Sequence, residues 1–390
     1  MTTLRYLTAG ESHGPSLVTV IEGIPAQLAL RADDIDADLA RRQRGYGRGG
    51  RMKIESDRVH IDAGIRNGAT LGSPIALRIE NRDFENWRGR MGAEPFDAPP
   101  EAVTLPRPGH ADLAGSLKYA THDARDILER ASARETAMRV AAGAVARVLL
   151  RAAGIEVASR VVSIAGVDDA RVYAPDEILA SRDRIEASSL RCLDDAHEAR
   201  MRDEIHRLSH AGDTAGGVIE AVAVGVMAGL GSHVQWDRRL DGRIAGAITS
   251  IQAIKAVEIG DGWNAASKPG SAVHDPIGFD ARAHRFTRAS NHAGGIEGGI
   301  SNGEPIVVRA AMKPIATLRD ALPSADLVTK NTARANVERS DVCAVPAAGV
   351  IVEAVLAWVL ATALLEKFGG DSMPELLRNV RSYRDALEAY

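Results

Sequence analysis

Two histidines lie in short turns of small residues, where they could transfer protons. His13 stands in Gly-Glu-Ser-His-Gly at 10–14, and His110 stands in Arg-Pro-Gly-His-Ala-Asp at 107–112. A histidine held by turn geometry can titrate near neutral pH and act as a general acid. Asp112 could orient the His110 ring, although a turn hydrogen bond is equally plausible there. Taken alone, a motif such as the one around His13 is more often a surface turn than a catalyst.

Arginines cluster in the stretch 41–51, where a predicted helix end runs into a glycine-rich loop. Arg41 and Arg42 have a simple explanation, because basic residues are favourable at a helix C-terminus. Arg48 lies between glycines, so its backbone can approach a ligand and its guanidinium can bind a phosphate through two hydrogen bonds. An RNA contact of the Arg-Gly-Gly type is the alternative, but the stretch is single and short.

The sequence Ser132-Ala133-Arg134-Glu135 before a long apolar-periodic run predicts a capping box at a helix start. In this motif Ser132 caps the helix and Glu135 reaches back to it. The free N–H groups of the helix start, flanked by Arg130 and Arg134, would form an anion site. An ordinary well-capped helix with two exposed arginines is the alternative.

Glycine pairs mark a third region late in the chain. Gly294-Gly295 and Gly298-Gly299 imply backbone that passes close to a ligand, and a flat ring with a phosphate tail would fit there. The spacing matches neither a dinucleotide-binding fingerprint nor a phosphate-binding Walker loop. Further on, Asp341 follows an arginine just before an apolar run, where it could be only the acid of a helix-entry turn.

The composition excludes some classes of function. The chain has 390 residues, a formal net charge of -4 and 4% aromatic residues, so no nucleic acid is expected as a partner. Cys192 and Cys343 lie far apart and fit a reducing cytosol, and the N-terminus lacks the apolar stretch of a signal peptide. We therefore expect a cytoplasmic protein. His206 and His210 have no third ligand nearby, so no metal site is expected.

Apolar periodicity predicts a mixture of strands and helices. Strands are predicted at Leu17 to Ile21, Ile75 to Ile79, Val218 to Val226 and Ile306 to Met312. Helices are predicted at Asp33 to Arg44, Ala133 to Ala153, Glu198 to Ser209 and Pro374 to Glu388. The apolar run from Val350 to Leu365 contains Glu353 and indicates a buried core helix, so no membrane contact is expected. The elements lack regular βαβ alternation, which favours an α+β fold, and no linker divides residues 1–390, which favours a single domain.

In their order along the chain, these motifs resemble those of the chorismate synthase family. The resemblance rests on the motifs at 10–14, 41–49 and 107–112, on Arg-Ala-Ser-Ala-Arg-Glu-Thr-Ala at 130–137, on Ser-Ile-Gln-Ala-Ile-Lys-Ala-Val-Glu-Ile-Gly at 250–260, on Gly-Gly-Ile-Ser-Asn-Gly at 298–303 and on Arg-Ser-Asp at 339–341. Two departures are minor. Val226-Met227-Ala228 replaces a turn in which the family pattern has a proline, and Trp263 replaces an expected phenylalanine.

The resemblance implies a lyase of the shikimate pathway. Such an enzyme converts 5-enolpyruvylshikimate 3-phosphate to chorismate and phosphate by an anti 1,4-elimination, the last common step of aromatic amino-acid biosynthesis. It implies reduced FMN as the cofactor, which transiently supplies electron density although the reaction has no net redox change. NADPH is the candidate reductant.

The resemblance also implies a role for each site residue. His13 would protonate the leaving phosphate, His110 would balance the charge of the reduced flavin, and Asp341 would take part in proton removal. Substrate anions would be bound by Ser12, Arg42, Arg48, Arg107 and Arg134. The implied FMN contacts are Arg130, Ala131, Ser132, Gln252, Ala253, Gly298, Lys313, Pro314, Ile315, Ala316, Thr317 and Arg339.

The fold implied by the resemblance is a β-α-β sandwich with helices between two antiparallel sheets, assembled as a homotetramer. Because the sequence has no dinucleotide-binding fingerprint, an external flavin reductase is the default partner. Two other functions stay open from the sequence. One is a flavin- or nucleotide-binding regulatory protein without turnover, which the three filled proton-handling positions disfavour. The other is an RNA-binding protein that uses the stretch 41–51.

Overall fold

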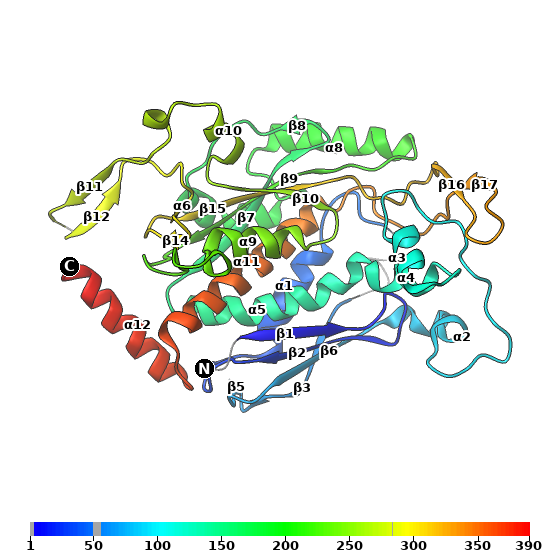
Figure 1. Cartoon of the computed structure of the whole chain (residues 1–390), viewed down its shortest axis with the longest axis horizontal. Helices are drawn as coiled ribbons and strands as arrows, with labels where there is room; N and C mark the ends of the chain where they lie inside the picture. Colours follow the sequence, from blue (N-terminus) through cyan, green and yellow to red (C-terminus); the bar gives the residue numbers. More distant parts are fainter. Residues whose placement is uncertain (1–3, 50–55, 283) are drawn as a thin grey trace.

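The computed structural model describes residues 4–49, 56–282 and 284–390 of the chain. The last residues of the arginine-rich stretch 41–51 therefore lie outside the described residues. Two antiparallel sheets enclose a layer of helices (Figure 1).

The first sheet has four strands in the order β1 (Arg5–Ala9), β2 (Ser16–Glu22), β6 (Ile75–Glu80) and β3 (Val59–Ala63). All neighbouring pairs are antiparallel. Residues alternate between the two faces, as a half-buried strand requires. Leu17 and Ile21 of β2 and Ile75 of β6 are buried on the inner face, whereas Val20 of β2 is exposed. The predicted strands at 17–21 and 75–79 are confirmed.

The second sheet has five strands in the order β10 (Ile254–Ile259), β15 (Ile306–Met312), β9 (Gly217–Val224), β7 (Glu156–Ile164) and β8 (Val167–Asp168). Each neighbouring pair is again antiparallel. The strands predicted at 218–226 and 306–312 correspond to β9 and β15. These two strands pair along their whole length and form the middle of this sheet.

Four helices form the layer between the sheets: α1 (Ala32–Gln43), α5 (Thr136–Ala152), α9 (Leu240–Thr249) and α11 (Val345–Phe368). Helices α1 and α5 pack on the four-stranded sheet, and α9 and α11 pack on the five-stranded sheet. Helices α5 and α11 approach closely at Gly143, where a Cβ atom would lie 2.4 Å from the Cβ atom of Ala354. This arrangement confirms the α+β class and the expected β-α-β sandwich.

Helix α11 is long and apolar enough to cross a membrane, but 94% of its most apolar window is buried inside the protein. It is therefore the central core helix that the sequence predicts. Its buried carboxylate, Glu353, accepts hydrogen bonds from Ser159, Arg41 and Arg191 at 2.7 Å each. Burial raises the pKa of Glu353, but the charges of Arg41, Arg191 and Arg147 outweigh burial and hold the pKa below its usual range. The ionised carboxylate ties α11 to α1 and α5.

Shorter elements connect and extend these layers. They are β4 (Ile65–Arg66), β5 (Ala69–Thr70), η2 (Arg82–Asn86), α2 (Arg88–Met91), α3 (Asp112–Tyr119), α4 (Arg125–Ala131), η3 (Ala133–Glu135), α6 (Pro175–Ala180), α7 (Arg182–Ala187), α8 (Asp195–His210), η4 (Trp236–Arg238), α10 (Gly262–Ala266), η5 (Gly270–Ala272), β11 (Ile277–Asp280), β12 (Arg285–Arg288), β13 (Ile296–Glu297), β14 (Ile300–Ser301), β16 (Pro323–Ala325), β17 (Thr332–Arg334) and α12 (Met373–Glu388). The predicted helices at 198–209 and 374–388 correspond to α8 and α12. His206 and His210 are exposed on α8, as expected of a solvated face.

The predicted capping box is only half right. The Ser132 hydroxyl accepts a hydrogen bond from the backbone N–H of Arg134 at 3.3 Å and caps the 3-10 turn η3, which precedes α5. The Glu135 carboxylate does not complete the motif. It accepts hydrogen bonds from Arg139 and from Gln252 instead. A charged donor one turn along the helix, Arg139, and the amide of Gln252 thus take the place of the backbone N–H in the motif, because a charge-assisted hydrogen bond is the stronger one.

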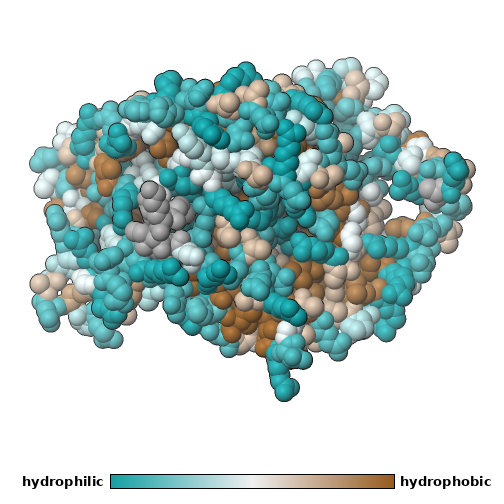
Figure 2. All heavy atoms as spheres, turned by 180° about the vertical axis from the view of Figure 1, so that it is seen from behind, coloured by the Kyte–Doolittle hydropathy of each residue, from teal (hydrophilic) through white to brown (hydrophobic). Residues whose placement is uncertain are grey.

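The outer face of the four-stranded sheet carries apolar residues. Leu7 of β1 pairs with Val20 of β2, and both side chains are exposed. Seen from behind, the surface is mostly hydrophilic, and apolar residues gather in the lower part of the view, at the level of this sheet (Figure 2).

Candidate active site

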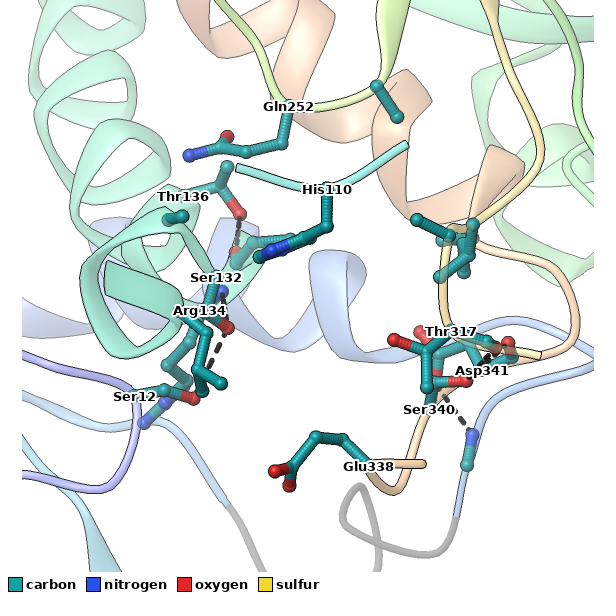
Figure 3. Close-up of a pocket in the computed structure, with 18 of the residues that line it drawn as sticks. Ser12, His110, Ser132, Arg134, Thr136, Gln252, Thr317, Glu338, Ser340 and Asp341 are labelled. Atoms are coloured by element: carbon teal, nitrogen blue, oxygen red, sulfur yellow. Dashed lines mark hydrogen bonds between the residues drawn. The ribbon is translucent and has the colours of Figure 1, made fainter. Parts of the chain in front are cut away.

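A cavity of about 430 Å³ opens at one end of the helical layer. Segments far apart in the sequence line it, including the turns around His13 and His110, the end of α1, η3, residues 312–317 and residues 338–341. Ser12, Ser132 and Arg134 lie on one side, Thr317 and Asp341 lie opposite, and His110 and Gln252 project from above (Figure 3). The size is that of a pocket for small organic ligands.

The imidazole ring of His13 is held at one edge by a carboxylate and at one face by an aromatic ring. Its Nδ1 lies 2.9 Å from Glu129 Oε1, and its ring stacks on Trp87 with centroids 4.0 Å apart. Neighbouring Ser12 accepts a hydrogen bond from the Ser132 hydroxyl at 3.2 Å. The sequence alone left open whether this turn is a surface turn or part of a catalytic site. The turn faces the cavity, and its histidine is held in place.

His110 shares a buried carboxylate with Arg107. Nδ1 of His110 lies 2.5 Å from Asp112 Oδ1, and Arg107 donates to Asp112 through its backbone N–H, Nε and Nη2. Arg107 Nη1 also donates to Thr317 Oγ1 at 2.8 Å. Burial raises the pKa of Asp112, but the hydrogen bonds from His110 and Arg107 outweigh burial and hold the pKa far below its usual range. Both alternatives that the sequence offers are therefore realised, since Asp112 orients the His110 ring and also accepts a turn hydrogen bond from the backbone N–H of Arg107.

Arg42 is a buried residue of the cavity lining, and one edge of its guanidinium group makes no hydrogen bond to a described residue. Its Nε and Nη2 donate to Thr136 Oγ1 at 3.0 and 2.9 Å, whereas Nη1 makes no hydrogen bond to a described residue and lies 3.6 Å from Asp57. Burial and the nearby charges of Arg134 and Arg48 lower the pKa of Arg42 to about 10, against the opposite effect of Asp57. An anion in the cavity would relieve this crowding of positive charge.

Arg134 is bonded to the protein, not displayed at a free helix end. Its Nη1 donates to both carboxylate oxygens of Asp57 at 2.7 and 2.8 Å, and Nε and Nη2 donate to Asn81 Oδ1. Its side chain is 3% exposed. The alternative of two exposed arginines at this helix start is therefore wrong for Arg134, because a buried acid from another segment binds it.

Arg48 and Asp341 meet across the mouth of the cavity. Arg48 Nε lies 3.3 Å from Asp341 Oδ2, and the backbone N–H of Gly49 donates to Asp341 Oδ1 at 2.6 Å. A Cβ atom at Gly49 would lie 2.8 Å from the Ser340 carbonyl oxygen, so the close approach of these two segments requires glycine. Asp341 is thus not merely the acid of a helix-entry turn, since it holds the arginine-rich loop at the cavity.

The rest of the cavity lining combines small and apolar residues with a few polar groups. Ala131, Ser132, Gln252, Ala253, Lys313, Ile315, Ala316 and Thr317 all line the cavity. Gln252 Oε1 is buried without a hydrogen-bond partner among the described residues, although its Nε2 donates to Glu135. Lys313 Nζ donates to the Gly109 carbonyl oxygen at 3.1 Å. Burial and nearby Lys255 lower the pKa of Lys313.

Three of the expected cofactor residues do not line the cavity. Arg130 turns away and donates to the Thr8 and Gly10 carbonyl oxygens. Gly298 lies in the turn between β13 and β14, and Pro314 lies within the 312–317 segment without lining the cavity. Arg339 does line it and pairs with Asp83 at 3.1 Å.

Sequence reasoning missed several residues of the site. Glu129, Asp57 and Asn81 hold its charged groups, and Trp87 and Glu338 line the cavity. Glu129 lies next to a recognised motif, yet nothing in its local sequence links it to a turn 116 residues away. Among the described residues, no group of three or more His, Cys, Asp or Glu side chains could hold a metal ion.

Comparison with known proteins places the chain in one family. The family model for chorismate synthase matches residues 4–365. A chorismate synthase of Desulforudis audaxviator is 58% identical over 99% of this chain and 98% of its own length, and one of Geotalea uraniireducens is 57% identical over 99% of this chain and all of its own length. A solved structure described as a crystal structure of chorismate synthase superposes with a TM-score of 0.81 at 43% identity, covering 100% of this chain and 99% of the other.

Proposed function

The chain belongs to the chorismate synthase family, and we propose that the cavity lined by His13 and His110 is where it converts 5-enolpyruvylshikimate 3-phosphate to chorismate and phosphate. The observation that carries this proposal is the charge of the cavity. Arg42, Arg48 and Arg107 line it together with both histidines. A substrate with two carboxylates and one phosphate needs such a set of fixed cations, and each arginine can bind an anion through two hydrogen bonds.

Reduced FMN fits the small and apolar part of the cavity lining. Ala131, Ala253 and Ile315 offer a small and apolar lining for a flat ring, and Gln252 Oε1 offers a buried acceptor that lacks a partner among the described residues. Lys313 and Ser132 would bind polar groups of the cofactor. When bound, FMN supplies transient electron density that helps phosphate leave.

The side chains of the cavity supply the proton transfers and the orientation. In this proposal His13 donates a proton to the leaving phosphate, and Asp341 takes part in removing the C6 hydrogen. His110, oriented by Asp112, balances charge on the cofactor side. Ser12, Arg42 and Arg48 bind the substrate anions directly. Most donors of Arg107 and Arg134 are used by other protein groups, so these two arginines contribute mainly their positive charge to substrate binding.

The proposal keeps the expected contacts to the cofactor from Arg130, Pro314, Gly298 and Arg339. Of these four residues, only Arg339 lines the cavity of this one chain. We further propose that residues 1–390 form one domain, that the protein is a cytoplasmic homotetramer, and that an external reductant keeps its flavin reduced. One core cluster includes residues of both sheets and of the helices between them, which supports the single domain.

Anaerobic phosphate release tests the proposal. Protein with dithionite-reduced FMN should release phosphate from 5-enolpyruvylshikimate 3-phosphate, and His13→Ala should lower kcat by about 10²- to 10⁴-fold, the range that a positioned general acid supplies. Folded protein that releases no phosphate under these conditions would remove the assignment. Full turnover by His13→Ala would remove only the role of His13.

A further inference from the structure

The carboxylate of Glu129 is buried directly behind the His13 turn. Glu129 lies on α4, and its side chain is 1% exposed. Its Oε2 accepts the backbone N–H of His13 at 2.8 Å, and its backbone carbonyl oxygen accepts the N–H of Ser12 at 3.0 Å. The turn that carries His13 is therefore fastened to α4 through both the backbone and the side chain of one residue.

The same carboxylate contacts the His13 ring. Nδ1 lies 2.9 Å from Oε1 and 3.1 Å from Oε2 of Glu129. Burial raises the pKa of Glu129, but the hydrogen bonds from His13 and Arg125 outweigh burial and hold the pKa below its usual range. An ionised carboxylate only accepts hydrogen bonds, so Nδ1 must carry a proton. The other ring nitrogen, Nε2, then faces away from Glu129.

The ring plane is fixed as well. His13 stacks on Trp87 with an interplanar angle of 26°, and the Arg125 guanidinium lies 5.1 Å from the Trp87 ring centroid. Arg125 also donates to Glu129 Oε1 at 3.1 Å and to Glu338 Oε1 at 2.8 Å. Among the described residues, the charged groups that these contacts join to His13 are Glu129 and Arg125 of α4 and, through Arg125, Glu338 of the cavity wall. Arg90 lies on Trp87, and Glu11 lies in the His13 turn.

We propose that Glu129 is the positioning residue for His13, keeping one proton on Nδ1 so that Nε2 is the atom that protonates the leaving phosphate. This inference rests on the proposed function. In the step, the C3–O bond breaks with its electron pair on phosphate, and the proton on Nε2 passes to that phosphate. His13 is left neutral with Nδ1 still donating to Glu129, and Nε2 is protonated again by solvent. The carboxylate also stabilises the imidazolium that precedes the step.

Two measurements on Glu129→Gln test the proposal. A glutamine can still accept the His13 backbone N–H through its amide oxygen, but its NH₂ group would donate to Nδ1 and move the ring proton of neutral His13 to Nε2. The first measurement is ¹⁵N NMR of protein labelled in its histidine rings, with the His13 signals assigned by their loss in His13→Gln. We expect Nδ1 of neutral His13 to be protonated in the parent and unprotonated in Glu129→Gln.

The second measurement is the pH profile of kcat. Loss of a negative charge beside the imidazolium disfavours the protonated ring, so the alkaline limb of the Glu129→Gln profile should move to lower pH. At neutral pH we expect kcat to fall by about 10- to 100-fold, within the contribution of a positioned general acid, while KM changes little. Glu198→Gln is the matched control, because Glu198 is another buried carboxylate that accepts a backbone N–H, from Ser189, and does not line the cavity. Its pH profile should coincide with that of the parent.

The NMR experiment needs neither substrate nor flavin, so it separates this inference from the proposed function. A parent protein whose neutral His13 carries its proton on Nε2 would overturn the role of Glu129 even if the enzyme turns over. So would a Glu129→Gln variant with the parent's tautomer and pH profile. If Glu129→Gln does not fold, the tautomer of the parent still decides the question. If the NMR signals show the expected tautomers but the protein does not turn over, the result would count against the proposed function alone.

Discussion

At the scale of single residues, the cavity holds its cations and histidines with buried carboxylates. Asp57 binds Arg134, Asp112 binds Arg107 and His110, and Glu129 binds His13. Such anchoring removes the conformational freedom of long side chains before the substrate binds, which favours tight and oriented binding.

The sequence located the groups that face the ligand better than the groups that hold them. His13, His110 and Asp341 stand in motifs and all line the cavity, as predicted. The partners Glu129 and Asp57 could not be found, because each contact joins segments that only the tertiary fold brings together. The role of each site residue in the reaction stays a prediction.

Arg42→Lys should weaken substrate binding. A lysine cannot keep the hydrogen bonds to Thr136 and also offer a second edge to an anion. A lost hydrogen bond to a charged group is worth about 1.5–3 kcal/mol, which corresponds to about 10- to 150-fold in kcat/KM. Steady-state kinetics checks this, with Arg44→Lys as the control, because Arg44 is exposed near the same helix end and does not line the cavity. Equal kcat/KM for Arg42→Lys and the parent would contradict the assignment.

At the scale of elements, long periodic segments were predictable and short ones were not. Helices α1, α8, α11 and α12 and strands β2, β6, β9 and β15 agree with the predicted ranges within a few residues. The short helices α3 and α4, which carry Asp112 and Glu129, have too few turns to show a clear apolar stripe. The capping box failed at Glu135 because Arg139 and Gln252 bind its carboxylate.

The crossing of α5 and α11 predicts a specific intolerance. A Cβ atom at Gly143 would lie 2.4 Å from Ala354 Cβ and 2.6 Å from its Cα and carbonyl oxygen, and backbone cannot give way cheaply. Gly143→Ala should therefore lower the free energy of unfolding by about 1–3 kcal/mol, the usual cost of overpacking. Gly246→Ala on α9 is the control. No atom would lie within 4 Å of its new Cβ, so it should leave stability unchanged or raise it by up to about 1 kcal/mol. The measurement is urea unfolding. Equal free energies of unfolding for the two variants would contradict the close packing of α5 against α11.

At the scale of the whole molecule, buried ionised carboxylates make stability depend on pH. Burial raises the pKa values of Glu353, Glu135 and Glu186, but neighbouring arginines outweigh it and hold them below their usual range. Their stabilisation is fully present above the unfolded pKa of about 4.3 and is lost as the pH falls through the lower folded values. The free energy of unfolding should therefore be nearly constant from neutral pH to about pH 5 and should fall below about pH 4.

Glu353→Gln should reveal the largest single part of this effect. Removing one partner from a buried ionic cluster costs about 3–5 kcal/mol, because Arg41 and Arg191 lose the fully buried carboxylate that both bind and keep only less buried partners such as Glu186. The deficit should be largest at neutral pH and should shrink below about pH 4. Urea unfolding at several pH values measures it, with Glu101→Gln as the control, because Glu101 is exposed. A deficit that is the same at every pH would contradict the ionised state of Glu353.

The most direct test of the whole account is one anaerobic reaction followed by three signals. With reduced FMN and 5-enolpyruvylshikimate 3-phosphate, the protein should form phosphate and chorismate in equal amounts, and the flavin absorbance after turnover should show that FMN is still reduced. Oxidised FMN should support no product. Phosphate without chorismate, flavin oxidised in proportion to product, or equal product with oxidised FMN would contradict a redox-neutral elimination in the arginine-lined cavity.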